Sequence, residues 1–407
     1  MSVTIDSLTP LSIINTAEVL KTVPTLDGSQ QQGNQDPMAF ENLQPYVHPP
    51  ESAEDLQWSD LVTLDLSELA RTGGKQSLAA QLSHAVHRVG FFYVKNFGLT
   101  QNQIDRQLTI AKALFDLPFE EKHKYSVDYS KGDYNGYRWG GYRADGSVAE
   151  NNHGDNIEAY NIPKFTPDFA GKYAHPPLIE RHIAEIESFS KHLHEHIVLP
   201  LMVLFGVLLE FSDDELLARL HSYEKLSDDH YRYMKYCRRT PKEHEETQGP
   251  QVKGHTDLGS LTLLFRQPVA GLQILGDDNQ WRYVRPLPDT VTVNVADILS
   301  LLTGGYFKSS VHRVIAPPQD QWGYDRMGLL YFARPHNDTI LRSLVSQSPV
   351  LQRNQAILEE GFTRPITMGE FTLAKQQMLL NPHVYDKKRD EQGTVELIAG
   401  FKDQNFK

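Results

Sequence analysis

Two stretches of the sequence, GHTDLGSLTLL at 254–264 and VNVADILSLLTGGYFKSSVHRV at 293–314, carry three candidate metal ligands within runs typical of β-strands. His255 and Asp257 are two positions apart, so in a strand their side chains point to the same face. His312 follows in the second stretch. Two imidazoles and one carboxylate on neighbouring strands can bind one face of an octahedral metal and leave three positions open, as in non-haem Fe(II) oxygenases. Because the chain has 17 histidines, a chance combination is the alternative.

The sequence around these side chains predicts a strand-rich core flanked by helices. Seven short runs rich in Val, Leu, Thr and Tyr lie between Tyr231 and Pro335, which favours an antiparallel barrel or sandwich. Strands are also predicted at 61–66 and 90–98, and helices before position 90, near 101–115 and from about 177 to 222. The segments expected are an N-terminal extension at 1–57, a region of helices, strands and pocket loops at 58–175, a helical segment at 176–230, the strand-rich core at 231–340, and a helical tail at 341–407.

Composition and charge exclude several classes of protein. The 407 residues are 40% hydrophobic and 23% charged, as in a globular chain, and the net charge of −12 disfavours a nucleic-acid partner. Cys237 is the only cysteine, which excludes an internal disulfide framework and indicates a reducing compartment. The first twenty residues contain no Lys or Arg, and the longest apolar stretch, 201–209, is about half of a membrane span. We therefore expect a cytoplasmic protein without a membrane or nucleic-acid partner, and the sequence leaves its oligomeric state open.

The two opening stretches also resemble a known family. Together with LVTLDL at 61–66, GFFYVKNFGL at 90–99, LFDLPFEEKHKY at 114–125 and NGYRWGGY at 135–142, they are similar to the Fe(II)- and 2-oxoglutarate-dependent oxygenases of the isopenicillin N synthase type. The resemblance spans about residues 58–340, in the order of the family. It implies a mainly β fold, with a double-stranded β-helix (jelly roll) core and flanking helices, and iron held by His255, Asp257 and His312. The cosubstrates implied are 2-oxoglutarate and dioxygen, with ascorbate as a candidate reductant and a small molecule as substrate.

The family pattern also points to the residues that hold 2-oxoglutarate. An Arg-x-Ser pair on the strand after the distal histidine matches Arg326 and Gly328 here, so the guanidinium is present and the serine hydroxyl is missing. A guanidinium can bind a carboxylate through two parallel hydrogen bonds. Tyr236 matches a tyrosine that helps to hold the cosubstrate, although Met234 replaces the family's Asn two positions earlier. On composition alone, Tyr236 is equally well explained as a core residue.

The resemblance further suggests residues that contact the substrate. Phe332 and Arg334 project from the strand after Arg326 towards the pocket mouth, in alternation with Ala333. An arginine at 334 suggests a carboxylate or another polar acceptor on the substrate, and its alternative is a solvated charge at an edge. Three further candidates come from the loop region that covers the pocket in relatives: Tyr137, Arg138 and Tyr160.

Other functions have weaker support. The string His192-Leu193-His194-Glu195-His196 matches the H-x-x-E-H pattern of some zinc peptidases, but no further carboxylate ligand is evident and such short motifs often match by chance. Within the same fold, Gly328 keeps open an oxidase that uses no 2-oxoglutarate, in which Arg326 would bind the substrate's carboxylate. A catalytically silent ligand-binding protein and a zinc hydrolase built on the three candidate ligands are further alternatives.

Overall fold

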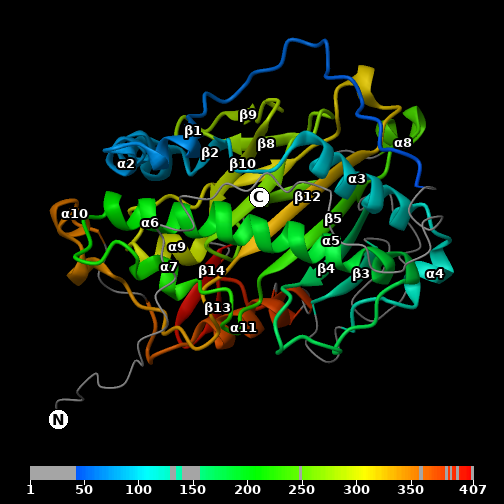
Figure 1. Cartoon of the computed structure of the whole chain (residues 1–407). Coiled ribbons are helices and arrows are strands. Elements are labelled where there is room, and N and C mark those ends of the chain that lie inside the picture. Colours follow the sequence, from blue (N-terminus) through cyan, green and yellow to red (C-terminus); the bar gives the residue numbers. More distant parts are fainter. Residues whose placement is uncertain are drawn as a thin grey trace, which may run out of the picture.

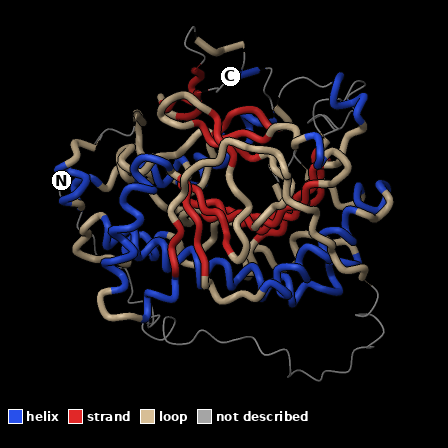
Figure 2. Tube along the Cα trace, turned by 90° about the horizontal axis from the view of Figure 1, so that it is seen from above, coloured by secondary structure: helices blue, strands red, loops and turns tan. Residues whose placement is uncertain are grey.

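The computed structural model describes residues 43–128, 134–139, 156–246, 250–356, 361–380, 384–385, 387–390 and 394–404. Two β-sheets form its centre, and the strands surround a common interior when seen from above (Figure 2). The larger sheet has eight strands in the order β1 (Thr63–Asp65), β2 (Phe91–Lys95), β10 (Thr290–Val295), β7 (Leu261–Phe265), β12 (Arg326–Ala333), β5 (His230–Tyr236), β4 (Ile157–Pro163) and β3 (Gly136–Trp139). The smaller sheet has four strands in the order β6 (Val252–His255), β11 (His312–Val314), β8 (Leu272–Leu275) and β9 (Trp281–Tyr283).

Helices cover the outer face of the larger sheet. A continuous helical stretch made of α5 (Pro177–Leu193), the π-helix η5 (His194–Val198) and α6 (Leu199–Leu208) crosses in front of this sheet (Figure 1). Phe189 of α5 packs against Tyr231 and Phe265 of the sheet, with ring centroids 5.6 and 5.5 Å apart. The stretch 177–208 is long and apolar enough to cross a membrane by composition alone, but 61% of its most apolar window is buried in the protein, as in a core helix.

The remaining helices and a hairpin lie around this centre. The helices are η2 (Leu66–Ala70), α2 (Gly74–His84), η3 (Ala85–Val89), α3 (Gln101–Phe115), α4 (Phe119–His123), α7 (Leu216–Leu220), α8 (Pro241–Glu246), α9 (Asp297–Leu302), η6 (Gln319–Gln321), η7 (Val345–Gln347), α10 (Pro349–Arg353) and α11 (Met368–Leu380). The hairpin pairs β13 (Thr394–Ile398) with β14 (Phe401–Gln404). α3 begins at a capping box in which Thr100 and Gln103 satisfy each other's backbone N–H groups, which explains why the sequence defines its start well.

Strand alternation separates the core of the larger sheet from its inner face. Tyr231 and Tyr233 of β5 are fully buried beneath the helices, whereas Arg232 and Met234 on the same strand line the interior pocket. Because both faces of the central strands are covered, their sequences lack the clean polar and apolar alternation of a half-exposed sheet. Packing of the apolar side chains against the helices therefore directs the alternate side chains of each strand into the pocket.

Two expectations from the sequence differ from the structure, and a third, the N-terminal extension, is described only from residue 43 onward. The strand β6, which ends at His255, is absent from the seven predicted runs because VKGH is short and polar. The tail is not only helical, since it ends in the β13–β14 hairpin. Of the expected extension, residues 1–42 lie outside the described part, and the rest runs along the surface, where the Ser52 hydroxyl and the Ala53 N–H donate to Asp320.

A buried histidine makes the stability of the fold depend on pH. The Nδ1–H of His221 donates to the Leu217 carbonyl and its Nε2 accepts from the Ser260 hydroxyl, both at 2.7 Å, and burial lowers its pKa to about 4. In the unfolded chain the pKa is about 6.5, so between these values the unfolded state binds a proton that the folded state does not, and stability falls as the pH falls.

We expect protonation of His221 to lower the free energy of unfolding by about 2 kcal/mol when the pH falls from 7 to 5. Urea unfolding of the wild type and of His221→Gln at both pH values measures the effect, because glutamine does not titrate in this range. The difference in unfolding free energy between the two proteins should shrink by that amount at pH 5. Equal differences at the two pH values would contradict the assignment.

Candidate active site

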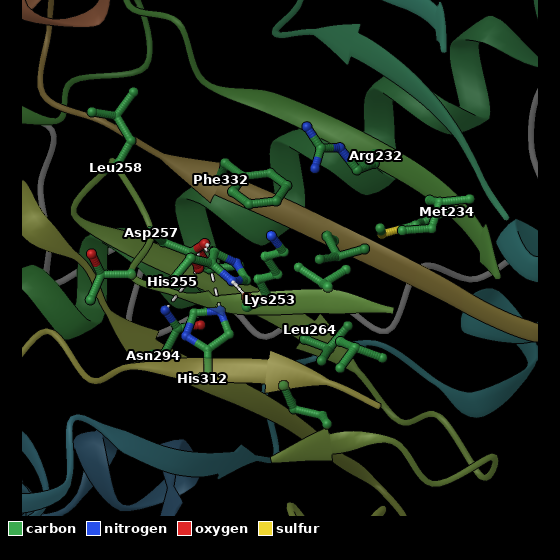
Figure 3. Close-up of a pocket in the computed structure, with 18 of the residues that line it drawn as sticks. Arg232, Met234, Lys253, His255, Asp257, Leu258, Leu264, Asn294, His312 and Phe332 are labelled. Atoms are coloured by element: carbon green, nitrogen blue, oxygen red, sulfur yellow. Dashed lines mark hydrogen bonds and ion pairs between the residues drawn. The ribbon is translucent and has the colours of Figure 1, made fainter. Parts of the chain in front are cut away.

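A pocket of about 580 Å³ lies between the two sheets and brings the three candidate metal ligands together. His255 ends β6, His312 begins β11, and these two residues are paired across the smaller sheet. Asp257 lies in the turn after β6, and its carboxylate points towards both imidazoles (Figure 3). One potential ligand atom from each of the three side chains lies within 4.8 Å of the other two. Within the described ranges, this is the one group of three or more His, Cys, Asp and Glu side chains whose ligand atoms come together in this way.

Hydrogen bonds fix the orientation of each ligand side chain. The Nδ1 atoms of His255 and His312 face the backbone oxygens of Lys253 and Ser310 at 2.9 and 3.1 Å, so each ring directs its Nε2 towards the centre. Each Nε2 lies 3.7 Å from Oδ1 of Asp257. Such outer contacts select the tautomer in which Nε2 is free to bind a metal.

The second oxygen of the Asp257 carboxylate is held from the larger sheet. Its Oδ2 accepts hydrogen bonds from the Thr262 hydroxyl at 2.7 Å and from the Asn294 amide at 2.9 Å. The sequence argument, which placed Asp257 on a strand beside His255, is wrong on this point because β6 ends at His255. The turn and these two donors, from β7 and β10, place the carboxylate opposite the imidazoles.

The charges at this centre suit a cation. Burial would raise the pKa of Asp257, but His312, His255 and the two hydrogen-bond donors hold it below its ordinary value. Burial lowers the pKa of His312 to about 4, so its imidazole is neutral at physiological pH. One carboxylate and two imidazoles facing an open pocket fit Fe(II), which takes oxygen and nitrogen donors and keeps positions free for other ligands.

Arg326 and Tyr236 line the same pocket. They are paired across β12 and β5, and the guanidinium lies 5.0 Å from the Tyr236 ring centroid. Arg326 is buried, and its Nε donates to the Val269 carbonyl at 3.0 Å. A guanidinium fixed in this way at a pocket wall is suited to bind a carboxylate.

The space beside Gly328 is filled by Gln267. A Cβ added at Gly328 would lie 2.6 Å from Nε2 of Gln267, and this amide also donates to the Met327 carbonyl at 2.9 Å. Gln267 lines the pocket, and its Oε1 is buried without a hydrogen-bond partner among the described residues. A side-chain amide therefore stands next to Arg326 where the family pattern has a hydroxyl. No sequence pattern indicated this role, because Gln267 and Gly328 are far apart along the chain.

The structure divides the predicted substrate residues into two groups. Phe332, Arg334 and Arg138 line the pocket. Tyr137 and Tyr160 do not: they are paired across β3 and β4 and lie in the hydrophobic core on the outer face. Their hydroxyls bond to Glu158 and His175. The prediction for these two tyrosines is wrong because their strand positions alternate with the inward-facing ones.

Several pocket residues were not among the site residues predicted from the sequence. Arg232 and Met234 reach the pocket from β5, and the helix α11 contributes side chains from the C-terminal tail, namely Lys375, Gln376 and Met378. α11 lies beyond the part of the chain that resembles the family. Alternation from Tyr236 along β5 could have indicated Arg232, because positions 232, 234 and 236 share one face.

The H-x-x-E-H string lies on the helical stretch away from this pocket. Nε2 of His192 bonds to the Phe97 carbonyl at 2.7 Å, and the His192 and His196 rings stack 4.2 Å apart. Burial lowers the pKa of His192 to about 4. These side chains serve the packing between helix and sheet, and the peptidase interpretation finds no support here.

The fold and the site together define a non-haem iron oxygenase, and comparison with known proteins identifies the family. Residues 61–179 match the model described as non-haem dioxygenase in morphine synthesis N-terminal, and residues 230–335 match the 2OG-Fe(II) oxygenase superfamily. The chain belongs to the 2OG-Fe(II) oxygenase superfamily and is an Fe(II)- and 2-oxoglutarate-dependent dioxygenase.

Individual relatives agree with this assignment. The chain is 31% identical over 291 residues to UPF0676 protein C1494.01 of Schizosaccharomyces pombe, covering 70% of this chain and 84% of that protein. It is 28% identical over 291 residues to the 2-oxoglutarate-dependent dioxygenase frbH of Dothideomycetidae sp., with the same coverage of 70% and 84%. A full-length Neurospora crassa protein, solved in complex with alpha-KG and thymine, is similar with a TM-score of 0.66 at 21% identity, covering 78% of this chain and 97% of that one. The predicted jelly-roll core with flanking helices is confirmed.

Proposed function

We propose that the protein oxidises an unactivated C–H bond of a small organic molecule, by hydroxylation, desaturation or ring closure, in the metabolism of natural products. His255, Asp257 and His312 hold Fe(II) in this proposal, and Arg326 with Tyr236 holds 2-oxoglutarate. The observation that carries it is the convergence of the three ligand atoms on a pocket that also contains a buried guanidinium.

The residues of the chain have distinct tasks in this reaction. When bound, Fe(II) and 2-oxoglutarate supply the activation of dioxygen, and 2-oxoglutarate leaves as succinate and CO2 while one oxygen atom is available to the substrate. The backbone oxygens behind the imidazoles, and the Thr262 and Asn294 donors behind Asp257, keep the ligands in position. Arg326 neutralises a carboxylate of the cosubstrate. Leu264, Phe332 and other apolar side chains of the wall limit the entry of water.

Succinate release tests this function directly. Protein loaded with Fe(II) and 2-oxoglutarate should form succinate in proportion to oxidised product when it turns over a small molecule. Under anaerobic conditions, a weak visible charge-transfer band should require both Fe(II) and 2-oxoglutarate. A band that does not depend on 2-oxoglutarate, or product formation without succinate, would support the alternative oxidase in which Arg326 binds the substrate.

Gln267 should take over the role of the missing serine. We expect Gln267→Ala to weaken 2-oxoglutarate binding about tenfold, because one hydrogen bond to a charged group contributes about 1.5 kcal/mol. The dissociation constant is measured by titrating the anaerobic Fe(II) protein with 2-oxoglutarate.

The double variant Gln267→Ala/Gly328→Ser provides the matched control. Removing the glutamine side chain clears the space that a Cβ at Gly328 would enter, and the serine restores a hydroxyl beside Arg326. We expect this variant to regain most of the lost affinity. Wild-type affinity in the single variant would show that Gln267 only fills space.

A further inference from the structure

We infer that the substrate carries one carboxylate group, which pairs with the buried guanidinium of Arg334. This inference rests on the proposed function, because it concerns the substrate of the same pocket. It narrows the class of substrate from small organic molecules to small organic monoanions with an apolar body.

Arg334 is a buried cation with no carboxylate paired to its guanidinium among the described residues. It follows β12, lines the pocket and is 5% exposed, so it is not the solvated edge charge that the sequence left open as an alternative. Its Nε and Nη1 are buried and have no hydrogen-bond partner within the described part of the chain. Burying a guanidinium without an anion is strongly unfavourable. A pocket that keeps such a group is therefore suited to an anion that arrives from outside.

Arg334 lies close to the loop that carries the candidate ligand Asp257. The backbone N–H of Arg334 donates to Oδ1 of Asp229 at 2.8 Å, and its guanidinium lies 5.7 Å from the Tyr134 ring centroid. A Cβ at Gly259 would lie 3.2 Å from Cγ of Arg334, so the side chain passes directly over the turn that follows Asp257. An anion bound to Arg334 would therefore leave the rest of the molecule near the candidate iron ligands.

The carboxylate that accepts from the Arg334 backbone has other partners as well. Asp229 is fully buried, and its Oδ2 lies 3.3 Å from Nδ1 of His194 and accepts from the Tyr331 hydroxyl at 3.2 Å. Its Oδ1 accepts from the Ser227 hydroxyl at 2.9 Å as well as from the Arg334 backbone. Among the described residues that line the pocket, the single acidic side chain is the candidate iron ligand Asp257.

The N–H donors of the neighbouring Arg232, in contrast, are engaged by neutral groups of the protein. Arg232 donates to the Asn161 side-chain oxygen at 2.6 Å and to the Tyr134 hydroxyl at 2.8 Å, and it lies 4.5 Å from the Phe332 ring centroid (Figure 3). Arg334 differs in having buried donors without a partner among the described residues, and two parallel donors of a guanidinium match one planar carboxylate. The apolar wall around Phe332 and Leu264 suits an uncharged body.

Paramagnetic relaxation by Mn(II) tests this inference without turnover. Wild-type protein is loaded with Mn(II) in place of Fe(II) and saturated with 2-oxoglutarate, so that a second carboxylate cannot occupy Arg326. Benzoate, benzamide and phenyl phosphate are then compared as probes through the relaxation rates of their ring protons. We expect benzoate to be relaxed at least tenfold more strongly than benzamide or phenyl phosphate.

Substitutions at Arg334 decide whether this residue is responsible. Arg334→Met should remove the preference for benzoate, Arg334→Lys should keep part of it, and the surface control Arg282→Met, which breaks an exposed pair with Asp278, should leave it unchanged. Equal relaxation of benzoate and benzamide, stronger relaxation of phenyl phosphate, no relaxation of benzoate, or a benzoate preference that survives Arg334→Met would each overturn the inference. Failure of Mn(II) to bind, seen in the relaxation of water, would instead count against the proposed function.

Discussion

Asp257→Ala should lower the turnover rate by about a thousandfold or more, while the protein stays folded. The carboxylate is the single negative charge among the three candidate ligands, and the two imidazoles alone would hold Fe(II) weakly at an open pocket. The expected observations are substoichiometric iron after gel filtration and no succinate release above background.

The fold should tolerate this change because the loss is local. Thr262 and Asn294 would each lose an acceptor, which costs about 1–3 kcal/mol per buried donor. This loss is partly offset because the charge of Asp257 no longer has to be buried. Circular dichroism and thermal unfolding check this point. Asp277→Ala is the matched control, since it removes an exposed carboxylate that pairs with Lys308, and it should bind iron and turn over normally. Full activity of Asp257→Ala would refute the metal site.

Arg326→Lys should raise the 2-oxoglutarate concentration needed for half-maximal turnover about a hundredfold. A guanidinium offers two parallel donors to a carboxylate, whereas an ammonium offers a point charge on a flexible stem, and losing the fork costs about 2–3 kcal/mol. The Val269 carbonyl and the Tyr236 ring, which position the guanidinium, cannot hold a lysine in the same way. The maximal rate at saturating 2-oxoglutarate should fall much less.

The matched control for this variant is Arg266→Lys. Arg266 pairs with Glu51 near the surface, outside the residues that line the pocket. We expect it to leave the 2-oxoglutarate requirement unchanged. If Arg326→Lys also leaves the 2-oxoglutarate requirement unchanged while substrate affinity falls, then Arg326 binds the substrate. That result would contradict the proposed role of Arg326 in holding 2-oxoglutarate.

The sequence predicted the parts of the site that are encoded by local patterns. The strand-like run with His312 and the run that follows Arg326 were visible because alternation is a local property of the chain, and His255 was noticed through its spacing from Asp257. Arg326 itself came from the family pattern. The resemblance misplaced Tyr137 and Tyr160, because it assigned them to a loop region over the pocket, whereas they lie on β3 and β4 and face the core. The spacing argument took Asp257 for a strand residue, although a turn and donors from two distant strands place it.

By itself, the sequence determined the family and the identity of the candidate ligands, because these depend on residue types in a fixed order along the chain. Only the tertiary structure decided that Gln267 fills the space beside Gly328, that α11 contributes to the pocket wall, and that the Arg334 guanidinium is buried with two of its nitrogens unpartnered among the described residues. These three properties depend on contacts between segments far apart in the chain. The free energy of burying a charge depends on every group around it, and the local sequence does not show which groups those are.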